Sequence, residues 1–341
     1  MSKAKPAVVP LHRLPSGPPA ADCFALLVEK TKGVTQAGKP FYNCKFRDAH
    51  RTVSTMVWGD GDFFADCDAT WHVGGFYKLR AIFGVHDRYG PQIAIVQIRE
   101  VIDADKTDGF AEGDFYERSR FDSEAMFEEL TKLAEAEIAD VHLKALTLGL
   151  LAVHADDLKR LPATQGKFFP FPGGWLEHTL SVTKNCLLLV DRYRLVYPEM
   201  TPPLNRDIVV SAAILHDLGR VAEYAVPGVP GVPVEITVEG RLFGHLALGR
   251  DLIRLEAAKH GELDRELLML LEHVVLVHLA LPEWGSPRLP AVPEALILHH
   301  ADDLDAKLEM FVRCLANDKS DGELTEPDSV LKRSLWKGRK A

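Results

Sequence analysis

The sequence predicts a two-domain protein in which a small all-β domain precedes an all-α domain. The chain of 341 residues is long enough for about two domains of ordinary size. Residues 24–101 contain short segments rich in β-branched and aromatic residues, separated by turn residues. After Asp122, apolar residues recur at helical spacing. We therefore expect a barrel or sandwich at residues 23–103 and a helical domain at residues 123–318.

The composition is that of an ordinary soluble globular protein. Hydrophobic residues make up 47% of the chain and charged residues 26%, and the apolar runs are much shorter than the roughly 20 residues that span a membrane. The N-terminus has lysines but no continuous apolar stretch, which argues against a secretory signal. The five cysteines form no CxxC pair and are typical of reduced thiols, so we expect a cytoplasmic protein.

The net charge of −9 at first disfavours a nucleic-acid partner, but the charge is unevenly distributed. Residues 1–105 carry 13 Lys and Arg against 11 Asp and Glu, whereas residues 106–341 carry 27 against 38. An acidic C-terminal part is expected if carboxylates surround a cation, and it is equally expected if these carboxylates only form a solvent-exposed acidic surface.

The expected β domain follows a proline-rich segment, residues 1–22, which we expect to be flexible. Within the domain, KPFYNCKFRD and TVSTMVWG alternate apolar and polar residues, and FYKLRAIFGVHD and QIAIVQIREV follow. Turn residues separate these segments at positions 37–39, 59–61, 74–75 and 89–91. Several short strands at this spacing predict a small barrel or sandwich.

The order of these segments resembles the OB-fold of the nucleic-acid-binding type. There, a Gly-Lys turn enters a strand, an Asp lies at the next turn, a Trp ends the following strand and a Gly-containing turn precedes the last. Gly38-Lys39, Asp48, Trp58 and Gly90 take these places. The resemblance implies a surface on which cationic and aromatic side chains grip single strands. The candidate nucleic-acid-binding residues are Lys39, Tyr42, Lys45, Arg47, Trp58, Lys78, Arg80 and Tyr89.

The rest of the chain is expected to be mostly helical. Residues 104–122 are polar and without clear periodicity, which predicts a linker, and helices are expected from there to residue 318. Two stretches interrupt the helical pattern, GKFFPFPGG at residues 166–174 and VPGVPGVPVEITVEG at residues 226–240. The second predicts a loop with a short hairpin. Residues 319–341 are basic and predict a flexible tail.

Histidines and aspartates recur along the helical stretch, each in an apolar setting. They are His178, the pair His216-Asp217, His245, His278 and Asp302. An adjacent His-Asp pair in an apolar helix is costly to bury alone, because a lone buried carboxylate pays a heavy desolvation penalty. Imidazole and carboxylate groups together are the ligands of a borderline divalent cation. A single histidine on an apolar face is usually a core or capping residue, so the combination carries the prediction of a metal-dependent hydrolase.

This order of residues resembles the HD-domain phosphohydrolase superfamily, whose metal ligands run His, His-Asp, Asp. In particular, the chain is similar to the YhaM-type 3′→5′ exoribonucleases, which join an N-terminal OB-fold to an HD domain. The resemblance spans roughly residues 24–310. The matching motifs are Gly173–Val182, Ile214–Arg220, Phe243–Gly249, Glu283–Pro290 and Glu294–Leu308.

The resemblance implies a set of metal ligands. The residues that would hold the first metal are His178, His216, Asp217 and Asp302. Asp303 and Asp305 are near enough to Asp302 to compete for its role, and Asp302 and Asp305, three apart, share a helix face. A mixed set of His and Asp suits Mn²⁺ or another first-row divalent ion better than Mg²⁺.

The resemblance also implies catalytic residues, which are Asp217, His245, His278 and Arg220. His245 and His278 would bind a second metal or the scissile phosphate, and Arg220 would stabilise charge on that phosphate. Three positions depart from the family pattern. Phe168-Phe169 replaces a His pair, Leu279 replaces a second His, and Arg220 stands where a Lys is usual. These departures leave the first metal set complete and concern the second metal.

The resemblance thus implies a metal-dependent 3′→5′ exonuclease that hydrolyses single-stranded RNA to nucleoside monophosphates, with single-stranded DNA left open as a substrate. Two alternatives also stay open. One is an HD phosphohydrolase of a small nucleotide, which would not need a strand-binding domain. The other is a nucleic-acid-binding protein whose HD domain has lost turnover. The expected partner is single-stranded RNA or DNA and not a membrane, and a homo-oligomer is expected by resemblance only.

Overall fold

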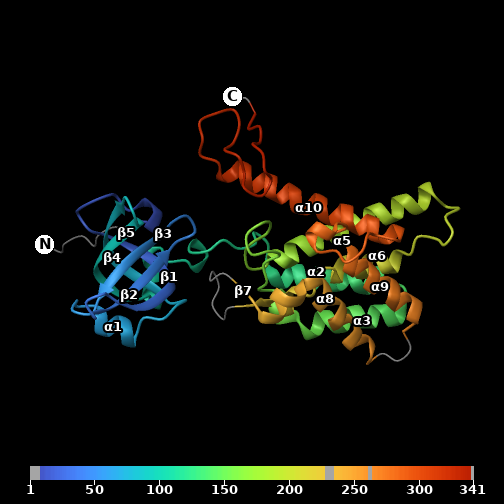
Figure 1. The fold of residues 1–341 in the computed structure, drawn as a ribbon, viewed down its shortest axis with the longest axis horizontal. Helices are drawn as coiled ribbons and strands as arrows, with labels where there is room; N and C mark the ends of the chain where they lie inside the picture. Colours follow the sequence, from blue (N-terminus) through green and yellow to red (C-terminus); the bar gives the residue numbers. More distant parts are fainter. Residues whose placement is uncertain (1–7, 227–233, 260–262, 339–341) are drawn as a thin grey trace. The chain divides into compact units, whose positions relative to one another are not determined.

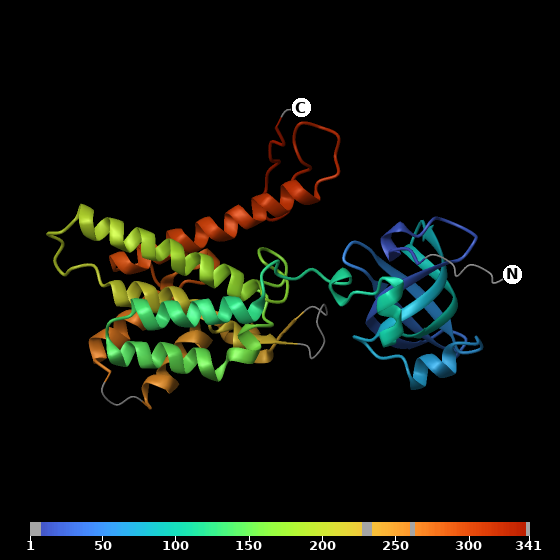
Figure 2. The same cartoon turned by 180° about the vertical axis from the view of Figure 1, so that it is seen from behind.

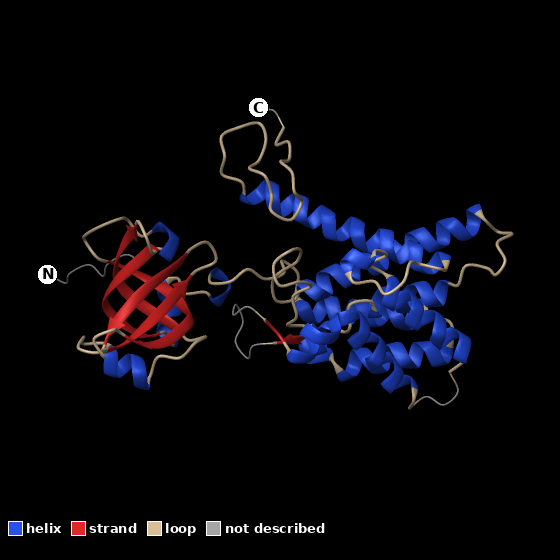
Figure 3. Cartoon of the chain, viewed as in Figure 1, coloured by secondary structure: helices blue, strands red, loops and turns tan. Residues whose placement is uncertain are grey.

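The structure is a computed structural model that describes residues 8–226, 234–259 and 263–338 (Figure 1; Figure 2). The chain divides into two compact units, one ending at Arg118 and the other beginning at Ser119. Strands dominate the first unit and helices the second (Figure 3). The predicted order of a β-sheet region followed by a helical domain is therefore confirmed.

Five strands form the first unit. They are β1 (Ala21–Val34), β2 (Pro40–Arg47), β3 (Thr52–Trp58), β4 (Phe76–His86) and β5 (Gly90–Glu100). They close into a barrel in the order β1-β2-β3-β5-β4, in which β3 and β5 run parallel and the other neighbouring strands run antiparallel. A short helix, α1 (Phe64–Ala69), connects β3 to β4. The closure between β3 and β5 is made through the pair Ser54 and Gln92.

Alternation of side chains along the strands builds the barrel core. In β2, Tyr42, Cys44 and Phe46 are buried, while the residues between them are partly exposed. Tyr77 and Leu79 of β4 alternate in the same way and join the same apolar cluster. The alternation in the sequence therefore identifies the side chains that face the interior.

The segment before β1 belongs to the barrel unit. Leu11, in the short 3-10 helix η1 (Leu11–Arg13), is fully buried, and it joins the barrel core together with Leu14. The expectation of a flexible segment at residues 1–22 is therefore corrected from residue 8 onward, because two leucines of this proline-rich stretch reach the core. The part of that expectation that concerns residues 1–7 lies outside the described residues.

The segment after β5 also packs on the barrel. It contains the 3-10 helices η2 (Asp103–Asp108) and η3 (Glu112–Asp114). Phe110 and Phe115 pack with Phe24 of β1 in a second apolar cluster. The expectation of a linker at residues 104–122 is therefore corrected as far as Tyr116, because the aromatic rings of this segment find apolar partners that its polar composition does not reveal.

The second unit is built from helices around one core. They are α2 (Ser123–Glu137), α3 (Val141–Val153), α4 (Ala155–Leu158), α5 (Gly174–Val196), α6 (Arg206–Leu215), α7 (Arg220–Glu223), α8 (Val238–Ala257), α9 (Arg265–Val277), α10 (Pro293–Asn317) and the 3-10 helix η4 (Pro282–Trp284). Asp122 caps α2 by accepting a hydrogen bond from the N–H of Ala125, at 2.9 Å. Helix α5 packs against α6 and α10, and the fully buried Trp175 of α5 lies in the core.

A two-residue strand pair interrupts the helices. Strands β6 (Tyr224–Ala225) and β7 (Glu235–Ile236) run antiparallel, which agrees with the short hairpin expected near residues 226–240. The middle of that expected loop, residues 227–233, lies outside the described residues. Within the described part of the chain, no helix is both long and apolar enough to cross a membrane.

The C-terminal segment folds back onto the end of α10. Lys337 Nζ donates to Asp318 Oδ2 at 2.6 Å, and the N–H of Thr325 donates to the carbonyl of Leu335 at 2.8 Å. Leu335 is buried. The expectation of a flexible tail at residues 319–341 is corrected as far as residue 338, because one of its cations finds a carboxylate next to the helix end; its last three residues lie outside the described residues.

Candidate metal centre

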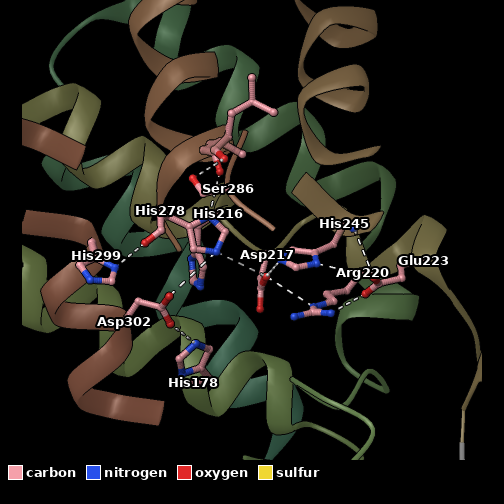
Figure 4. A network of polar contacts seen from close by, with 12 residues as sticks. His178, His216, Asp217, Arg220, Glu223, His245, His278, Ser286, His299 and Asp302 are labelled. Atoms are coloured by element: carbon pink, nitrogen blue, oxygen red, sulfur yellow. Dashed lines mark hydrogen bonds and ion pairs between the residues drawn. The ribbon is translucent and has the colours of Figure 1, made fainter. Parts of the chain in front are cut away.

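The predicted metal ligands come from four helices whose inner faces meet. His178 lies in the second turn of α5, and Asp302 lies in the middle of α10. His216 and His278 directly follow the last residues of α6 and α9. Their imidazole rings gather around the carboxylates of Asp217 and Asp302 (Figure 4). Residues that are up to 124 positions apart in the chain are therefore brought into one buried cluster.

His216 and His278 are oriented in the same way. The Nδ1 atom of each lies 2.8 Å from the backbone carbonyl three residues earlier, at Ala213 and Val275 respectively. A carbonyl only accepts hydrogen bonds, so Nδ1 carries the proton and Nε2 is left with a free lone pair. Burial lowers the pKa of both rings, that of His278 to about 4, so both are neutral at pH 7. Each ring therefore offers Nε2 to the centre of the cluster as a ligand.

His178 lies between two carboxylates. Its Nε2 is 3.1 Å from Asp302 Oδ1, and its Nδ1 is 2.8 Å from Asp305 Oδ2. Burial disfavours the charged ring, but the hydrogen bonds to Asp302 and Asp305 outweigh it and raise the pKa of His178 to about 10. Burial would also raise the pKa of Asp302, but His178 and the other imidazoles lower it to about 2. The ring and its carboxylates are thus strongly coupled.

Asp217 is the central carboxylate of the cluster. Its Oδ1 lies 3.2 Å from His245 Nε2 and 3.4 Å from Arg220 Nε. Burial acts to raise the pKa of Asp217, but the positive charge of Arg220 and the neighbouring imidazoles lower it. The indole N–H of Trp175 donates to the backbone carbonyl of Asp217 at 2.9 Å and fixes the chain at this point. Asp217 is therefore an ionised candidate ligand whose backbone is held by Trp175.

Two glycines allow α8 to bring His245 to Asp217. A Cβ on Gly219 would lie 1.9 Å from the carbonyl oxygen of His245, so only glycine permits this close approach. Gly244 has φ +68° and interrupts α8 just before His245. The kink and the close approach together place the His245 ring against the carboxylate.

The donor atoms of the cluster fit a divalent cation. Three overlapping groups have ligand atoms within 4.8 Å of one another, namely His178-His216-Asp217, His216-His278-Asp302 and Asp217-His245-His278. Among the described residues, His216 Nε2, Asp217 Oδ1 and His245 Nε2 are buried and have no hydrogen-bond partner. A buried polar atom without a partner costs about 1–3 kcal/mol, and a cation bound by His178, His216 and Asp217 would satisfy the first two of these atoms. The cluster could therefore hold a divalent metal.

Arg220 and Glu223 support the cluster from one side. Arg220 donates through NH1 to Glu223 Oε2 and, at 3.1 Å, to the Tyr224 hydroxyl. Glu223 Oε1 accepts from the N–H of His245 at 3.3 Å. Neighbouring carboxylates, Asp217 first among them, outweigh the effect of burial and raise the pKa of Arg220, which stays charged. The sequence prediction did not include Glu223, although its carboxylate follows Arg220 by one helical turn.

The structure separates the three aspartates that compete on α10. Asp302 faces the cluster, and Asp305 contacts the outer nitrogen of His178. Asp303 pairs with Lys307 at 2.7 Å on the outside of the helix. Of the three aspartates, Asp302 is the one that belongs to a group of possible metal ligands, and its ligand role stays a prediction.

The positions that depart from the family pattern lie beside the cluster. The rings of Phe168 and Phe169 lie 5.1 and 5.6 Å from the ring of His178. Leu279 is half-buried directly after His278. His299, which the sequence prediction did not include, donates through Nδ1 to the backbone carbonyl of His278 at 2.7 Å. The two phenylalanines thus cover His178 with apolar surface.

Most of the cations predicted to bind nucleic acid in the barrel unit already have partners. Lys78 lies 3.1 Å from Asp105, and Arg80 forms a two-point ion pair with Asp22. The other pairs are Lys39 with Asp60 and Lys45 with Glu29, while Arg47 is half-buried and donates to the carbonyl of Asp48. Tyr42 is buried, and its hydroxyl donates to Asp68. Composition could not reveal these partners, because several lie far away in the sequence.

Trp58 and Tyr89 are different, since they are 48% and 62% exposed. Both line a groove of about 500 Å³ between β3 and the turn that joins β4 to β5. His86 lies 4.8 Å from the Tyr89 ring, and the Arg88 guanidinium lies 5.5 Å from its centre. This groove collects the exposed aromatic side chains of the predicted binding set.

Part of the helical unit matches a known protein family. Residues 175–307 match the model of the HD domain family, a span that includes every predicted ligand of the cluster. The chain therefore contains an HD domain, which supports a place in the HD phosphohydrolase superfamily and implies a metal-dependent hydrolase.

Proposed function

We propose that this protein is a metal-dependent 3′→5′ exonuclease that removes nucleotides from single-stranded RNA. The observation that carries the proposal is the presence, in one chain, of an HD domain with a complete His/Asp cluster and of a barrel with an exposed aromatic groove. A hydrolase of small nucleotides would need the cluster but not the groove.

We further propose that the barrel is an OB-fold. Its support is a closed five-stranded barrel in the order β1-β2-β3-β5-β4, with a helix between β3 and β4. Such barrels bind single strands by stacking bases on aromatic rings, at about 1–3 kcal/mol per base. Trp58 and Tyr89 are the exposed rings of the groove, and Arg88 adds a cation beside Tyr89. We therefore assign strand binding to this groove rather than to the paired cations.

In the metal centre, His178, His216, Asp217 and Asp302 would hold the first ion. A first-row ion such as Mn²⁺ fits a mixed set of imidazoles and carboxylates. When bound, such an ion withdraws charge from a phosphoryl oxygen and makes a water molecule a better nucleophile. The chain's own contribution is the fixed orientation of the ligand nitrogens, which the hydrogen bonds at Nδ1 provide.

Three further side chains would act on the phosphate. His245 and His278 present Nε2 close to Asp217, at 3.2 and 3.9 Å, and could bind either a second ion or phosphate oxygens. Arg220 keeps its positive charge in the buried site and would stabilise negative charge that develops there. Because an arginine keeps its proton, this role is electrostatic and not a proton transfer.

The test is an incubation of the full-length protein with 5′-labelled single-stranded RNA and Mn²⁺, with single-stranded DNA in parallel. We expect products that shorten from the 3′ end, and none with EDTA or with Asp217→Asn. Release of phosphate or pyrophosphate from small nucleotides with intact RNA would instead assign a small-nucleotide hydrolase. Metal binding and RNA binding without turnover on any substrate would identify a silent HD domain.

A further inference from the structure

Within the described part of the chain, Asp305 contacts the His/Asp cluster through His178. It lies on α10 one turn after Asp302, and its Oδ2 is 2.8 Å from His178 Nδ1. Its other oxygen, Oδ1, accepts a hydrogen bond from the hydroxyl of Ser181. The His178 side chain is completely buried, and that of Asp305 is only 13% exposed. Both carboxylate oxygens therefore have a partner, and Asp305 belongs to none of the groups of possible metal ligands found among the described residues.

We infer that Asp305, held by Ser181, is a positioning residue that sets the orientation and proton position of His178 and thereby the site's affinity for a divalent cation. The inference rests on the proposed metal-dependent function. A carboxylate accepts hydrogen bonds only, so Asp305 would keep a proton on Nδ1 while a cation takes the place of the proton on Nε2. Asp302 and Asp305 flank the ring on its two nitrogen sides, which fixes the rotation of the imidazole.

This arrangement distinguishes His178 from the two other imidazoles of the cluster whose Nδ1 is anchored. His216 and His278 are held by backbone carbonyls, which carry no net charge. A hydrogen bond from Nδ1 to a carboxylate makes the imidazole a more basic metal ligand than a hydrogen bond to a backbone carbonyl does. Loss of such an outer partner typically weakens metal binding about 10–100-fold.

The chain offers a matched control on the same helix. Asp303 is two residues from Asp305 and carries the same charge, but it pairs with Lys307 away from the cluster. Asp305→Asn keeps the size of the side chain and an oxygen that can accept from Nδ1, so it tests the charge. Ser181→Ala keeps the charge but removes the group that holds Asp305.

The experiment measures Mn²⁺ affinity by calorimetric titration and the thermal stability of the metal-free protein, without RNA. We expect Asp305→Asn to raise the Kd about 10–100-fold, Ser181→Ala to raise it less, and Asp303→Asn to leave it within about twofold of the parent. A role in stability alone would lower the Tm of the metal-free variant and leave the Kd unchanged. A lower Tm with an unchanged Kd for Asp305→Asn would overturn the inference. If Asp305→Asn does not fold, the same result for Ser181→Ala would overturn it.

The readout separates this inference from the proposed function. If the parent protein binds Mn²⁺ and Asp305→Asn weakens binding while no RNA is degraded, the positioning role stands and the exonuclease proposal is wrong. If the parent protein binds no Mn²⁺, the positioning role is overturned together with the metal site.

Discussion

Binding of a divalent metal to the cluster should release about one proton near pH 7.5, and that proton should come from His178. Burial lowers the pKa of this ring, but the hydrogen bonds to Asp302 and Asp305 raise it to about 10, so both of its nitrogens carry protons at that pH. A metal needs Nε2 unprotonated. The pKa values of the other first-metal ligands are all lowered, so those groups have no proton to lose.

The size of this effect follows from the proton count. With one proton displaced per ion, the apparent Kd should fall about tenfold for each pH unit between roughly pH 6.5 and 8.5. Calorimetric titration with Mn²⁺ in buffers of different ionisation enthalpy measures the number of protons directly. A slope near zero against the ionisation enthalpy would refute the reasoning. His178→Gln should bind Mn²⁺ more weakly, and with no proton release, which identifies the source of the proton.

Four further predictions follow from the contacts described above. In the metal-free fold the pKa of His178 is about 10, above its ordinary value of 6.5. The contribution of this ring to folding stability is therefore complete below about pH 6.5 and is lost as the pH rises towards 10. Urea unfolding of the metal-free protein should show a lower free energy of unfolding at pH 9 than at pH 6. Leu11→Ala should lower the free energy of unfolding of the barrel by about 2–5 kcal/mol, measured by urea unfolding. A change near zero would mean that the segment before β1 does not contribute to the barrel core. Trp58→Ala and Tyr89→Ala should each weaken the binding of single-stranded RNA by about 1–3 kcal/mol, measured by fluorescence anisotropy. Unchanged affinity in both variants would exclude the groove as the RNA-binding site. Arg220→Met should destabilise the helical unit by about 3–5 kcal/mol, because it leaves buried carboxylates unpaired; a Tm equal to that of the parent would contradict this.

The residues of the cluster could be singled out in the sequence because charged and imidazole side chains are rare in apolar helices, and their ligand roles stay a prediction from the resemblance. His216, Asp217 and Asp302 stand out because they occupy positions where the helical spacing of apolar residues predicts a core residue. The roles of Asp303 and Asp305 could not be separated in this way, since both lie within one turn of Asp302. The structure separates them through their neighbours, because α5 supplies His178 to Asp305, and Lys307 takes Asp303.

Candidate strand-binding residues are harder to choose from the sequence, because the availability of a cation depends on distant partners. Arg80 pairs with Asp22, which is 58 residues away, and no local pattern announces that contact. Trp58 and Tyr89 could be chosen as candidates but not joined into one groove, since β3 and β5 meet only through the closure of the barrel. Similarly, the polar composition of residues 104–122 concealed the burial of Phe110, and the prolines of residues 1–22 concealed that of Leu11.

The way in which each imidazole is anchored has a consequence for how the site tolerates mutation. His216 and His278 are oriented by carbonyls of their own helices, and no single side-chain replacement can remove a backbone carbonyl. His178 depends on the side chains of Asp305 and Ser181, either of which one substitution can delete. Random mutagenesis with a growth or activity screen should therefore recover partial-loss variants around His178 more often than around the other two rings. Substitutions that accumulate in α5 and α10 would then change the orientation of His178, while the orientations of His216 and His278 stay the same.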